Sequence, residues 1–425
     1  MEAGEPGTTR NPNKGVRMKL GKVAAFAMAW QVAGCAMDNA PDVSTESASD
    51  GLVAAPHAQV ASQTGALRTA LQNGLDKLHA DGVVGDVGRV SDGCDRIDGH
   101  GGVARLGGKQ PVALQSQFRM GSNTKTFVAV VMLQLVDEGR VRLDDPIDRW
   151  LPGVVSGNGN DGTKITIRNL LQHTSGLYNY TGDLFAVFGI EDYYATRFQH
   201  YEPEQLVALA VSHAPNFAPG TAWSYSNTNY ILAGMIIKKV TRHEWSSEVR
   251  ARILAPLHLD HTLEPGDSPD LPAPHAEGYS ELEAGKPLVD VTLSNVSVAG
   301  AAGSLITTTD DLTRFWRALQ TGKLLSPARM AEMHTTVPAT ELEGVIPGAR
   351  DGLGIFWTPT RCGGYWTHLG DTFGFSTRSG VSEDGSRAVV VSQSTTIDNA
   401  SGFAVAKQLL DDDLETIENV MCAGQ

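Results

Sequence analysis

The stretch from Ser122 to Glu138, SNTKTFVAVVMLQLVDE, constrains the fold more than any other part of the sequence. After its polar start it carries apolar residues at nearly every position, so a helix formed here has almost no polar face. A helix that is apolar all round belongs in the interior of a large domain. The run is too short to span a bilayer and its ends are polar, so we do not interpret it as a membrane segment. Gly139 supplies a C-terminal stop.

The pattern around this helix indicates a sheet completed by both ends of the chain. Leucines at helical spacing end near Gly82, and short β-like runs follow at residues 83–90 and 102–106. Residues 150–310 alternate helical stretches with Gly, Pro and Asn turns. Strands at 372–381 and 387–393 flank the hairpin signal Glu383-Asp384-Gly385, and a last helix is predicted over residues 402–420. This order predicts one sheet with an inserted helical subdomain.

The polar start of the central helix places a nucleophile beside an amine. Ser122 and Lys125 are three residues apart, so a helix projects both from one face. The helix N-terminus favours a developing negative charge, and a neighbouring amine can take the hydroxyl proton. The pattern S-x-x-K is common by chance, and the alternative is an N-capping serine with a solvated lysine. The apolar helix behind the pair favours a buried lysine, which needs a partner.

Two further polar elements can complete such a site. Tyr225 and Asn227 follow a Pro-Gly turn, and the phenol can protonate a leaving group while the amide holds Lys125. His368 precedes a strand-like segment, where a cation would polarise Tyr225 and a backbone N–H would complete an oxyanion hole with that of Ser122. Taken alone, each element is more simply a structural turn or a structural histidine.

Together, the motifs S-x-x-K, Y-x-N and H-x-G resemble the serine penicillin-recognising superfamily. The segments LQLVDEG at 133–139 and HTSGLY at 173–178 add to a likeness that runs from about residue 65 to residue 425. The chain is most similar to the class C β-lactamase and D-alanyl-D-alanine carboxypeptidase branch, especially its secreted Streptomyces carboxypeptidases. The resemblance implies an α+β fold in which both chain ends form one antiparallel sheet, flanked by helices and carrying an all-helical insertion.

The resemblance also implies a catalytic role for each motif residue. Ser122 would attack an acyl carbonyl while Lys125 assists the proton transfer, and Tyr225 would carry the proton to the leaving amine. Asn227 and His368 would position and polarise these groups. An acyl-enzyme would form and water would release it, so neither a metal nor a cofactor is expected.

The substrate-binding part departs from the family pattern. Gly370 and Phe185 match it, and the N–H of Asp371 would bind the oxyanion together with that of the serine. Leu369 replaces a hydroxyl residue that would hydrogen-bond a substrate carboxylate, and Phe356 aligns with an arginine that would hold the same group. A lost charge-assisted contact costs roughly 1.5–3 kcal/mol, which is enough to change the preferred substrate.

We therefore predict a hydrolase that works through an acyl-enzyme, with its acyl donor open. The leading hypothesis is a D-alanyl-D-alanine carboxypeptidase acting on cell-wall peptides. The same centre would also serve an esterase, a β-lactamase or a D-amino-acid amidase, and a penicillin-binding sensor is the non-enzymatic alternative. The net charge of −14 disfavours nucleic acid, so the expected partner is a small peptide, ester or β-lactam, bound by a monomer.

The first 35 residues are typical of an export signal, with a basic segment, a short apolar run and small residues before Cys35. Lipidation of Cys35 would tether the protein to a membrane, whereas ordinary signal cleavage would secrete it, and both remain open. Residues 36–63 are predicted as a flexible tether and residues 64–425 as the hydrolase domain.

The cysteines fit an oxidising compartment outside the cytoplasm. There we expect Cys362 to pair with Cys422, as the resemblance also implies. This pairing leaves Cys94 as a free thiol, for which the sequence suggests no role.

Overall fold

The computed structural model describes residues 55–185, 189–398 and 403–424. The predicted export signal, including the proposed lipidation site Cys35, lies outside the described residues. Helix α1 (Ala55–Ala80) begins inside the segment predicted as a tether. Among the helices of the described ranges, none is both long enough and apolar enough to cross a membrane.

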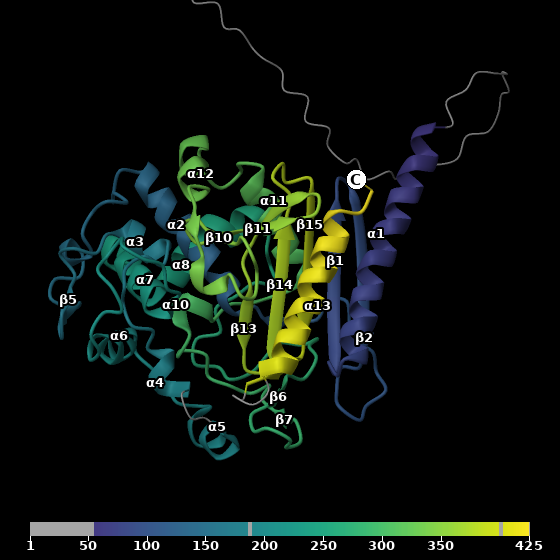
Figure 1. The fold of residues 1–425 in the computed structure, drawn as a ribbon, viewed down its shortest axis with the longest axis horizontal. Coiled ribbons are helices and arrows are strands. Elements are labelled where there is room, and N and C mark those ends of the chain that lie inside the picture. The colour runs from purple at the N-terminus through teal and green to yellow at the C-terminus, as the bar shows by residue number, and fades with distance from the viewer. Residues whose placement is uncertain (1–54, 186–188, 399–402, 425) are drawn as a thin grey trace, which may run out of the picture. The chain divides into compact units, whose positions relative to one another are not determined.

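One large antiparallel sheet joins the two ends of the described chain (Figure 1). Strand β1 (Gly85–Asp92) pairs with β2 (Asp95–Gly102) on one side and with β15 (Arg387–Gln393) on the other. Strand β14 (Phe375–Val381) continues the sheet beyond β15 and also pairs with the short strand β13 (Gly370–Thr372). The predicted sheet of both chain ends is confirmed. The remaining strands of this path are β12 (Gly363–Thr367), β11 (Phe356–Thr360), β10 (Arg350–Asp351) and β9 (Val337–Pro338).

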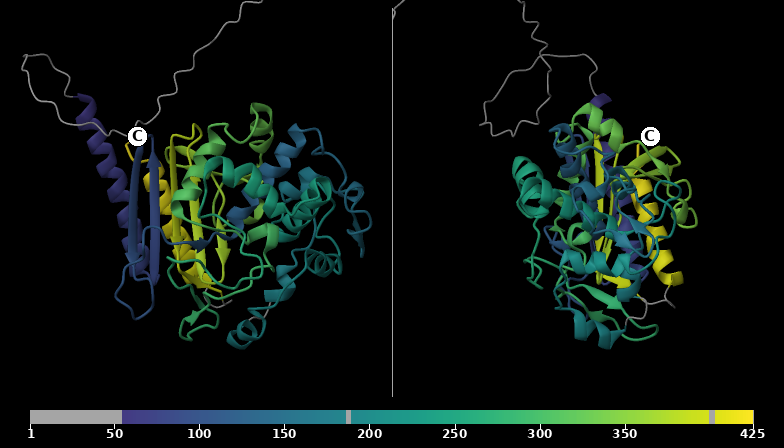
Figure 2. Two further views of the ribbon diagram at one scale, coloured as in Figure 1. Left: turned by 180° about the vertical axis from the view of Figure 1, so that it is seen from behind. Right: turned by 90° about the vertical axis from the view of Figure 1, so that its left-hand side faces the viewer.

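Helices cover both faces of this sheet (Figure 2). On one face α1 and α13 (Phe403–Met421) lie side by side, and on the other lies α11 (Thr309–Gln320). The alternation of side chains along β15 explains this arrangement. Val389 and Val391 belong to the core beneath α1 and α13, whereas Ala388 and Val390 belong to the larger core on the opposite side.

The central apolar segment forms helix α2 (Thr124–Asp137), preceded by a 3₁₀ turn, η1 (Gly121–Asn123). Nearly all of its side chains are buried, as the sequence predicted. The ring of Phe127 stacks on that of Phe315 in α11, with ring centroids 3.7 Å apart. This contact joins the central helix to a helix that packs on the sheet.

The helical middle of the chain packs against the other side of α2. Helix α7 (Asn227–Thr241) contacts α2 and α10 (Gly300–Gly303), so residues far apart in sequence meet at the N-terminus of α2. A small sheet is formed by β6 (Tyr279–Glu281), β7 (Val289–Asp290) and β16 (Thr395–Ile397). It lies below β13 in the view of Figure 1. The insertion also contains α3 (Ile167–Leu171), α4 (Thr181–Phe185), α5 (Ile190–Thr196), α6 (Pro203–Val211) and α8 (Trp245–Val249).

Two sequence-based expectations are corrected by the fold. The strand predicted at residues 102–106 is absent from the described chain, and β2 lies instead at Asp95–Gly102. Its sequence, DRIDGHGG, is polar because β2 forms the edge of the described sheet and only part of its surface is buried. The pairing of Cys362 with Cys422 is confirmed, with Cα atoms 5.7 Å apart. Cys94 is disulfide-bonded as well, so the expectation of a free thiol is wrong.

Candidate active site

The backbone around Ser122 lies directly against strand β13. Gly121 adopts a φ of +52°, and a Cβ added to it would lie 2.6 Å from the backbone nitrogen of Asp371. A Cβ added to Gly370 would in turn overlap the carbonyl oxygen of Met120. The two glycines therefore let the turn and the strand approach closely. This approach brings the turn that carries Ser122 close to the N–H of Asp371, and these two residues are the ones expected to supply the oxyanion-hole donors.

Lys125 is the buried cation of the site. Its side chain is 0% exposed, and its Nζ lies 2.8 Å from Ser122 Oγ and donates to Asn227 Oδ1 and to the carbonyl of Ala302, both at 2.7 Å. Burial lowers the pKa of Lys125 well below that of an exposed lysine, since it disfavours the charged form. An amine in this state can accept a proton from the serine hydroxyl that it contacts.

Tyr225 lies over the same amine. Lys125 Nζ is 4.9 Å from the centre of its ring. Burial raises the pKa of the Tyr225 phenol, and a hydrogen bond with the side chain of Ser122 opposes this shift. The phenol is therefore protonated in the resting site. Lys125 and Tyr225 have pKa values displaced in opposite directions, which separates a proton acceptor from a proton donor.

Two buried histidines lie near Lys125. His368 Nδ1 lies 2.6 Å from the carbonyl oxygen of Leu369, and burial lowers the pKa of His368 to about 3. The imidazole is neutral near pH 7, so the expectation that His368 supplies a cation is wrong. His173, whose ring centroid lies 4.4 Å from that of Tyr225, accepts the backbone N–H of Ser226 at 3.2 Å. It holds the loop that carries Tyr225.

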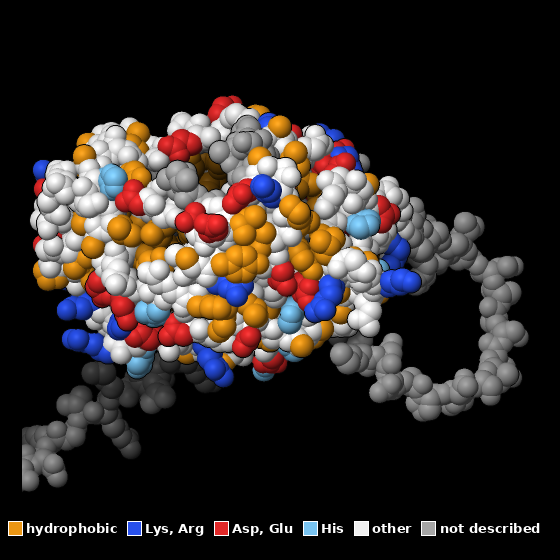
Figure 3. All heavy atoms as spheres, turned by 90° about the horizontal axis from the view of Figure 1, so that it is seen from below, with side chains coloured by type: hydrophobic (Ala, Val, Ile, Leu, Met, Phe, Trp, Pro, Cys, Tyr) orange, Lys and Arg blue, Asp and Glu red, His pale blue; other side chains and the backbone are white. Residues whose placement is uncertain are grey.

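A cavity of about 330 Å³ opens beside these groups. Ser122, Asn227 and Asp371 line it, and Phe185 does so as expected, its ring edge-to-face with that of Phe373 at 5.3 Å. On the face of the molecule shown in Figure 3, acidic and hydrophobic side chains surround a hollow.

Leu369 and Phe356 pack in the apolar cluster that also contacts Tyr225. This cluster contains Trp223, Ala339 and Ile346. Neither side chain carries a polar group that could hold a substrate carboxylate, so the loss of this grip, expected from the sequence, stands beside the catalytic tyrosine.

Two residues with structural importance for the site were missed at the sequence level. Asn123 is fully buried, and it accepts from Ser379 Oγ at 2.9 Å while donating to the carbonyl of Met120 at 3.2 Å. It fastens the nucleophile turn to β14. Arg119 lines the cavity floor, where its Nη2 donates to the carbonyl of Pro269 at 2.7 Å. Their position next to Ser122 was the only available signal.

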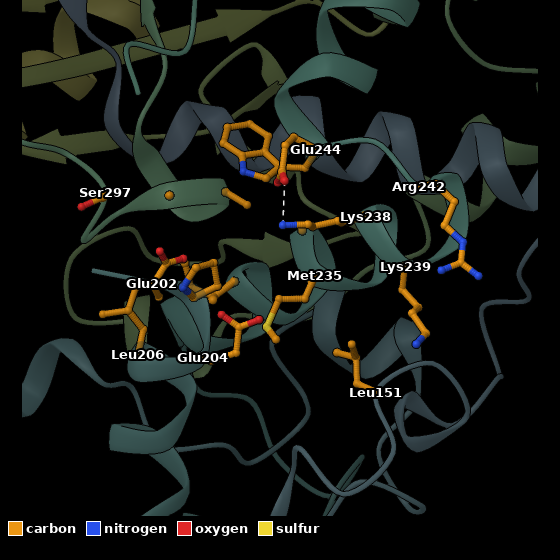
Figure 4. Close-up of a pocket in the computed structure, with 16 residues that line it drawn as sticks. Leu151, Glu202, Glu204, Leu206, Met235, Lys238, Lys239, Arg242, Glu244 and Ser297 are labelled. Atoms are coloured by element: carbon orange, nitrogen blue, oxygen red, sulfur yellow. Dashed lines mark ion pairs between the residues drawn. The ribbon is translucent and has the colours of Figure 1, made fainter. Parts of the chain in front are cut away.

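A second cavity, of about 390 Å³ and shown in Figure 4, also borders α10. Gly300 and Ala301 face it, whereas Ala302 and Gly303 of the same helix line the cavity of Ser122. Its lysine Lys238 pairs with Glu244 at 2.6 Å. Its described lining pairs no nucleophile with a buried amine, so we assign the chemistry to the smaller cavity.

Comparisons with known proteins agree with this geometry. Over 84% of its length the chain is 40% identical to a D-stereospecific amidohydrolase from Streptomyces sp., covering 99% of that structure with a TM-score of 0.76. It is 28% identical to the D-amino acid amidase of Ochrobactrum anthropi SV3, covering 84% of this chain and 98% of that one, with a TM-score of 0.71.

Curated relatives share a shorter stretch. The chain is 30% identical to penicillin-binding protein 4* of Bacillus subtilis over 236 residues, which are 53% of this chain and 50% of that protein. The chain is also 32% identical to penicillin-binding protein 4 of Amycolatopsis lactamdurans, over a stretch that covers 38% of this chain and 40% of that protein. The chain thus spans half or less of these two curated relatives. The Beta-lactamase family matches residues 67–412, most of the sequence, and the chain belongs to this family of serine hydrolases.

Proposed function

We propose that this chain is a serine amidohydrolase that forms an acyl-enzyme at Ser122 and acts on amides of D-amino acids. The observation that carries the proposal is the 2.8 Å contact between Lys125 Nζ and Ser122 Oγ within a buried site. The preference for D-amino-acid amides is supported by the names of the two structural relatives, one a D-stereospecific amidohydrolase and the other a D-amino acid amidase.

Acylation follows from the opposite pKa shifts of two side chains. Lys125 accepts the hydroxyl proton of Ser122 as Oγ attacks the carbonyl carbon, and the N–H groups of Ser122 and Asp371 stabilise the oxyanion. As the C–N bond breaks, Tyr225 donates its phenolic proton to the leaving nitrogen, and the ammonium of Lys125 restores it. The product is an ester of Ser122 and a free amine.

Deacylation repeats these transfers with water. A water molecule that gives its proton to the Tyr225–Lys125 pair attacks the ester carbonyl, and Ser122 recovers its proton as the acid leaves. Asn227 holds the Lys125 amine in place throughout. His368 contributes a neutral ring rather than a charge.

A D-alanyl-D-alanine carboxypeptidase is the second candidate. The relatives named penicillin-binding proteins favour it. The positions of Leu369 and Phe356 disfavour it, because both side chains lie in an apolar cluster where a carboxylate grip would be needed. In either case we propose an enzyme of the cell envelope or the exterior that works as a monomer.

Parallel assays test the proposal. D-alanine amide, its L-enantiomer, an acyl-D-Ala-D-Ala peptide, a neutral aryl ester and a chromogenic cephalosporin are each given to the wild type and to Ser122→Ala. We expect the D-amide to be the best amide substrate and mass spectrometry to find the acyl group on Ser122. Full activity in Ser122→Ala, or an adduct on another residue, would overturn the proposal, and faster peptide turnover would favour the second candidate.

A further inference from the structure

Asp371 combines a backbone role with an exposed side chain at the same cavity. Its N–H adjoins the turn of Ser122, while its carboxylate is 60% exposed. Oδ1 accepts from Arg378 Nη2 at 2.9 Å and from Ser376 Oγ at 2.7 Å. Both bonds end on this oxygen, and no hydrogen bond from the described side chains ends on Oδ2. The second oxygen is therefore placed to accept from a ligand.

Arg378 is not available to a substrate anion. It lies on β14, next to Thr377, which pairs with Gly370. Besides Asp371 it contacts the buried carboxylate of Asp413 on α13, with Nε 3.3 Å from Oδ2. Its side chain is only 8% exposed. Its guanidinium is engaged by both Asp371 and Asp413, so a substrate carboxylate beside β13 would have to displace Asp371 from it.

The rest of the described cavity wall also exposes negative charge and keeps its positive charge buried. Its charged side chains are Arg119, Asp371 and Asp398. Arg119 is 1% exposed and donates to the backbone carbonyls of Pro269 and Thr292, whereas both carboxylates reach the surface. The accessible charge of the described wall is therefore negative, which favours a cationic group on the substrate.

We propose that Asp371 binds the α-ammonium group of the substrate and makes the site selective for D-amino-acid amides with a free amino group. This inference rests on the proposed function, because it requires an acyl carbonyl at Ser122. In an amino-acid amide the α-nitrogen is two bonds from the carbonyl carbon. A carbonyl oxygen held by the N–H of Asp371 therefore brings the ammonium close to the side chain of the same residue.

The test compares two chromogenic substrates that differ only in this charge, D-alanine p-nitroanilide and N-acetyl-D-alanine p-nitroanilide. The readout is the ratio of their kcat/KM values. Asp371→Asn keeps the shape of the side chain and removes its charge, so we expect the ratio to fall roughly 10- to 100-fold, as for loss of one charge-assisted hydrogen bond. An unchanged ratio would overturn the inference, even if kcat/KM fell equally for both anilides.

Asp398→Asn is the matched control, since it removes the other exposed carboxylate of the cavity. It should change the ratio much less. A change as large as that of Asp371→Asn would contradict specific binding by Asp371 and indicate a general effect of negative charge in the cavity. The wild type separates this inference from the proposed function. If it cleaves both anilides without preferring the free amine, only the ammonium site fails. If it cleaves neither anilide nor a neutral aryl ester, the proposed function fails.

Discussion

Lys125 Nζ lies 2.7 Å from Asn227 Oδ1, and this contact joins the first turn of α2 to the first residue of α7. The amide oxygen is a neutral acceptor, so it orients the lysine without strongly favouring its charged form. A carboxylate in the same place would hold the proton on the lysine. The choice of asparagine therefore keeps Lys125 able to act as a base.

Replacing the lysine should remove the base while leaving the fold intact. Lys125→Met keeps most of the buried side-chain volume, so we expect kcat/KM for an aryl ester to fall by about 10²–10⁴ through loss of general-base catalysis. Stopped-flow acylation by that ester measures the effect. Lys164→Met, at an exposed lysine with 73% of its side chain accessible, is the control and should retain the wild-type rate. Rapid acylation of Lys125→Met would exclude the lysine as the base.

Asn227→Asp tests the argument from charge directly. The new carboxylate would raise the pKa of Lys125, because an opposite charge at hydrogen-bond distance favours the ammonium form. The unprotonated amine would then appear only at higher pH. We expect the acid limb of the kcat/KM profile to move to higher pH, with activity recovering in alkaline buffer. A uniform loss at all pH values would instead indicate that Asn227 matters through contact with the substrate.

The close approach of the nucleophile turn and β13 can be opened by one methyl group. In Gly370→Ala the added Cβ would overlap the carbonyl oxygen of Met120, so β13 must move away from the turn. We expect kcat to fall by about 10²–10³, as for loss of one oxyanion-hole donor. Gly344→Ala is the control, because a Cβ there meets nothing within 4 Å. Steady-state kinetics with thermal unfolding would show whether activity is lost in a folded enzyme.

The neutral His368 predicts a dependence of stability on pH. Its pKa is about 3 in the folded protein and 6.5 for an ordinary histidine. Between these values the unfolded chain binds more protons than the folded one, so stability rises with pH up to about 6.5 and is lost as pH falls. We expect His368→Asn to flatten the decline in unfolding free energy by up to about 1.4 kcal/mol per pH unit, measured by urea unfolding. Parallel curves for the two proteins would contradict the assignment.

The parts of the fold that the sequence predicted are those with strong local patterns. The apolar run of α2, the hairpin of β14 and β15, and the cysteine pair each carry a signal within a few residues or a known spacing. Strand β2 carries none, because it lies at the edge of the described sheet and its polar residues alternate with glycine. Its position depends on pairing with β1, which a local pattern does not encode.

The same limit applies to the site. The motif residues Ser122, Lys125, Tyr225 and Asn227 were named from sequence, and the structure brings them together. The charge state of His368 was not predictable, because burial by distant segments determines it. The orientation of Leu369 likewise depends on the cluster formed by Trp223 and Ala339, from two other parts of the chain. The sequence therefore identified the catalytic residue types, whereas their burial and charge state could be determined only from the folded structure.

The disulfide between Cys362 and Cys422 connects the turn between β11 and β12 to the end of α13. The bond closes a loop of 60 residues, for which the chain-entropy relation gives a stabilisation of about 4 kcal/mol. Arg387 also holds this end of the chain, since its Nη1 donates to the carbonyl oxygens of Val420, Met421 and Ala423.

The double variant Cys362→Ser, Cys422→Ser should therefore keep its active site at low temperature yet unfold more easily. We expect its unfolding free energy to fall by about 4 kcal/mol, with little change in kcat under conditions where it remains folded. Urea unfolding of the variant, rather than of the reduced wild type, is the right measurement, because a reductant would also break the bond of Cys94. An unfolding free energy equal to that of the wild type would show that the noncovalent contacts of α13, those of Arg387 among them, hold this end of the chain without the disulfide.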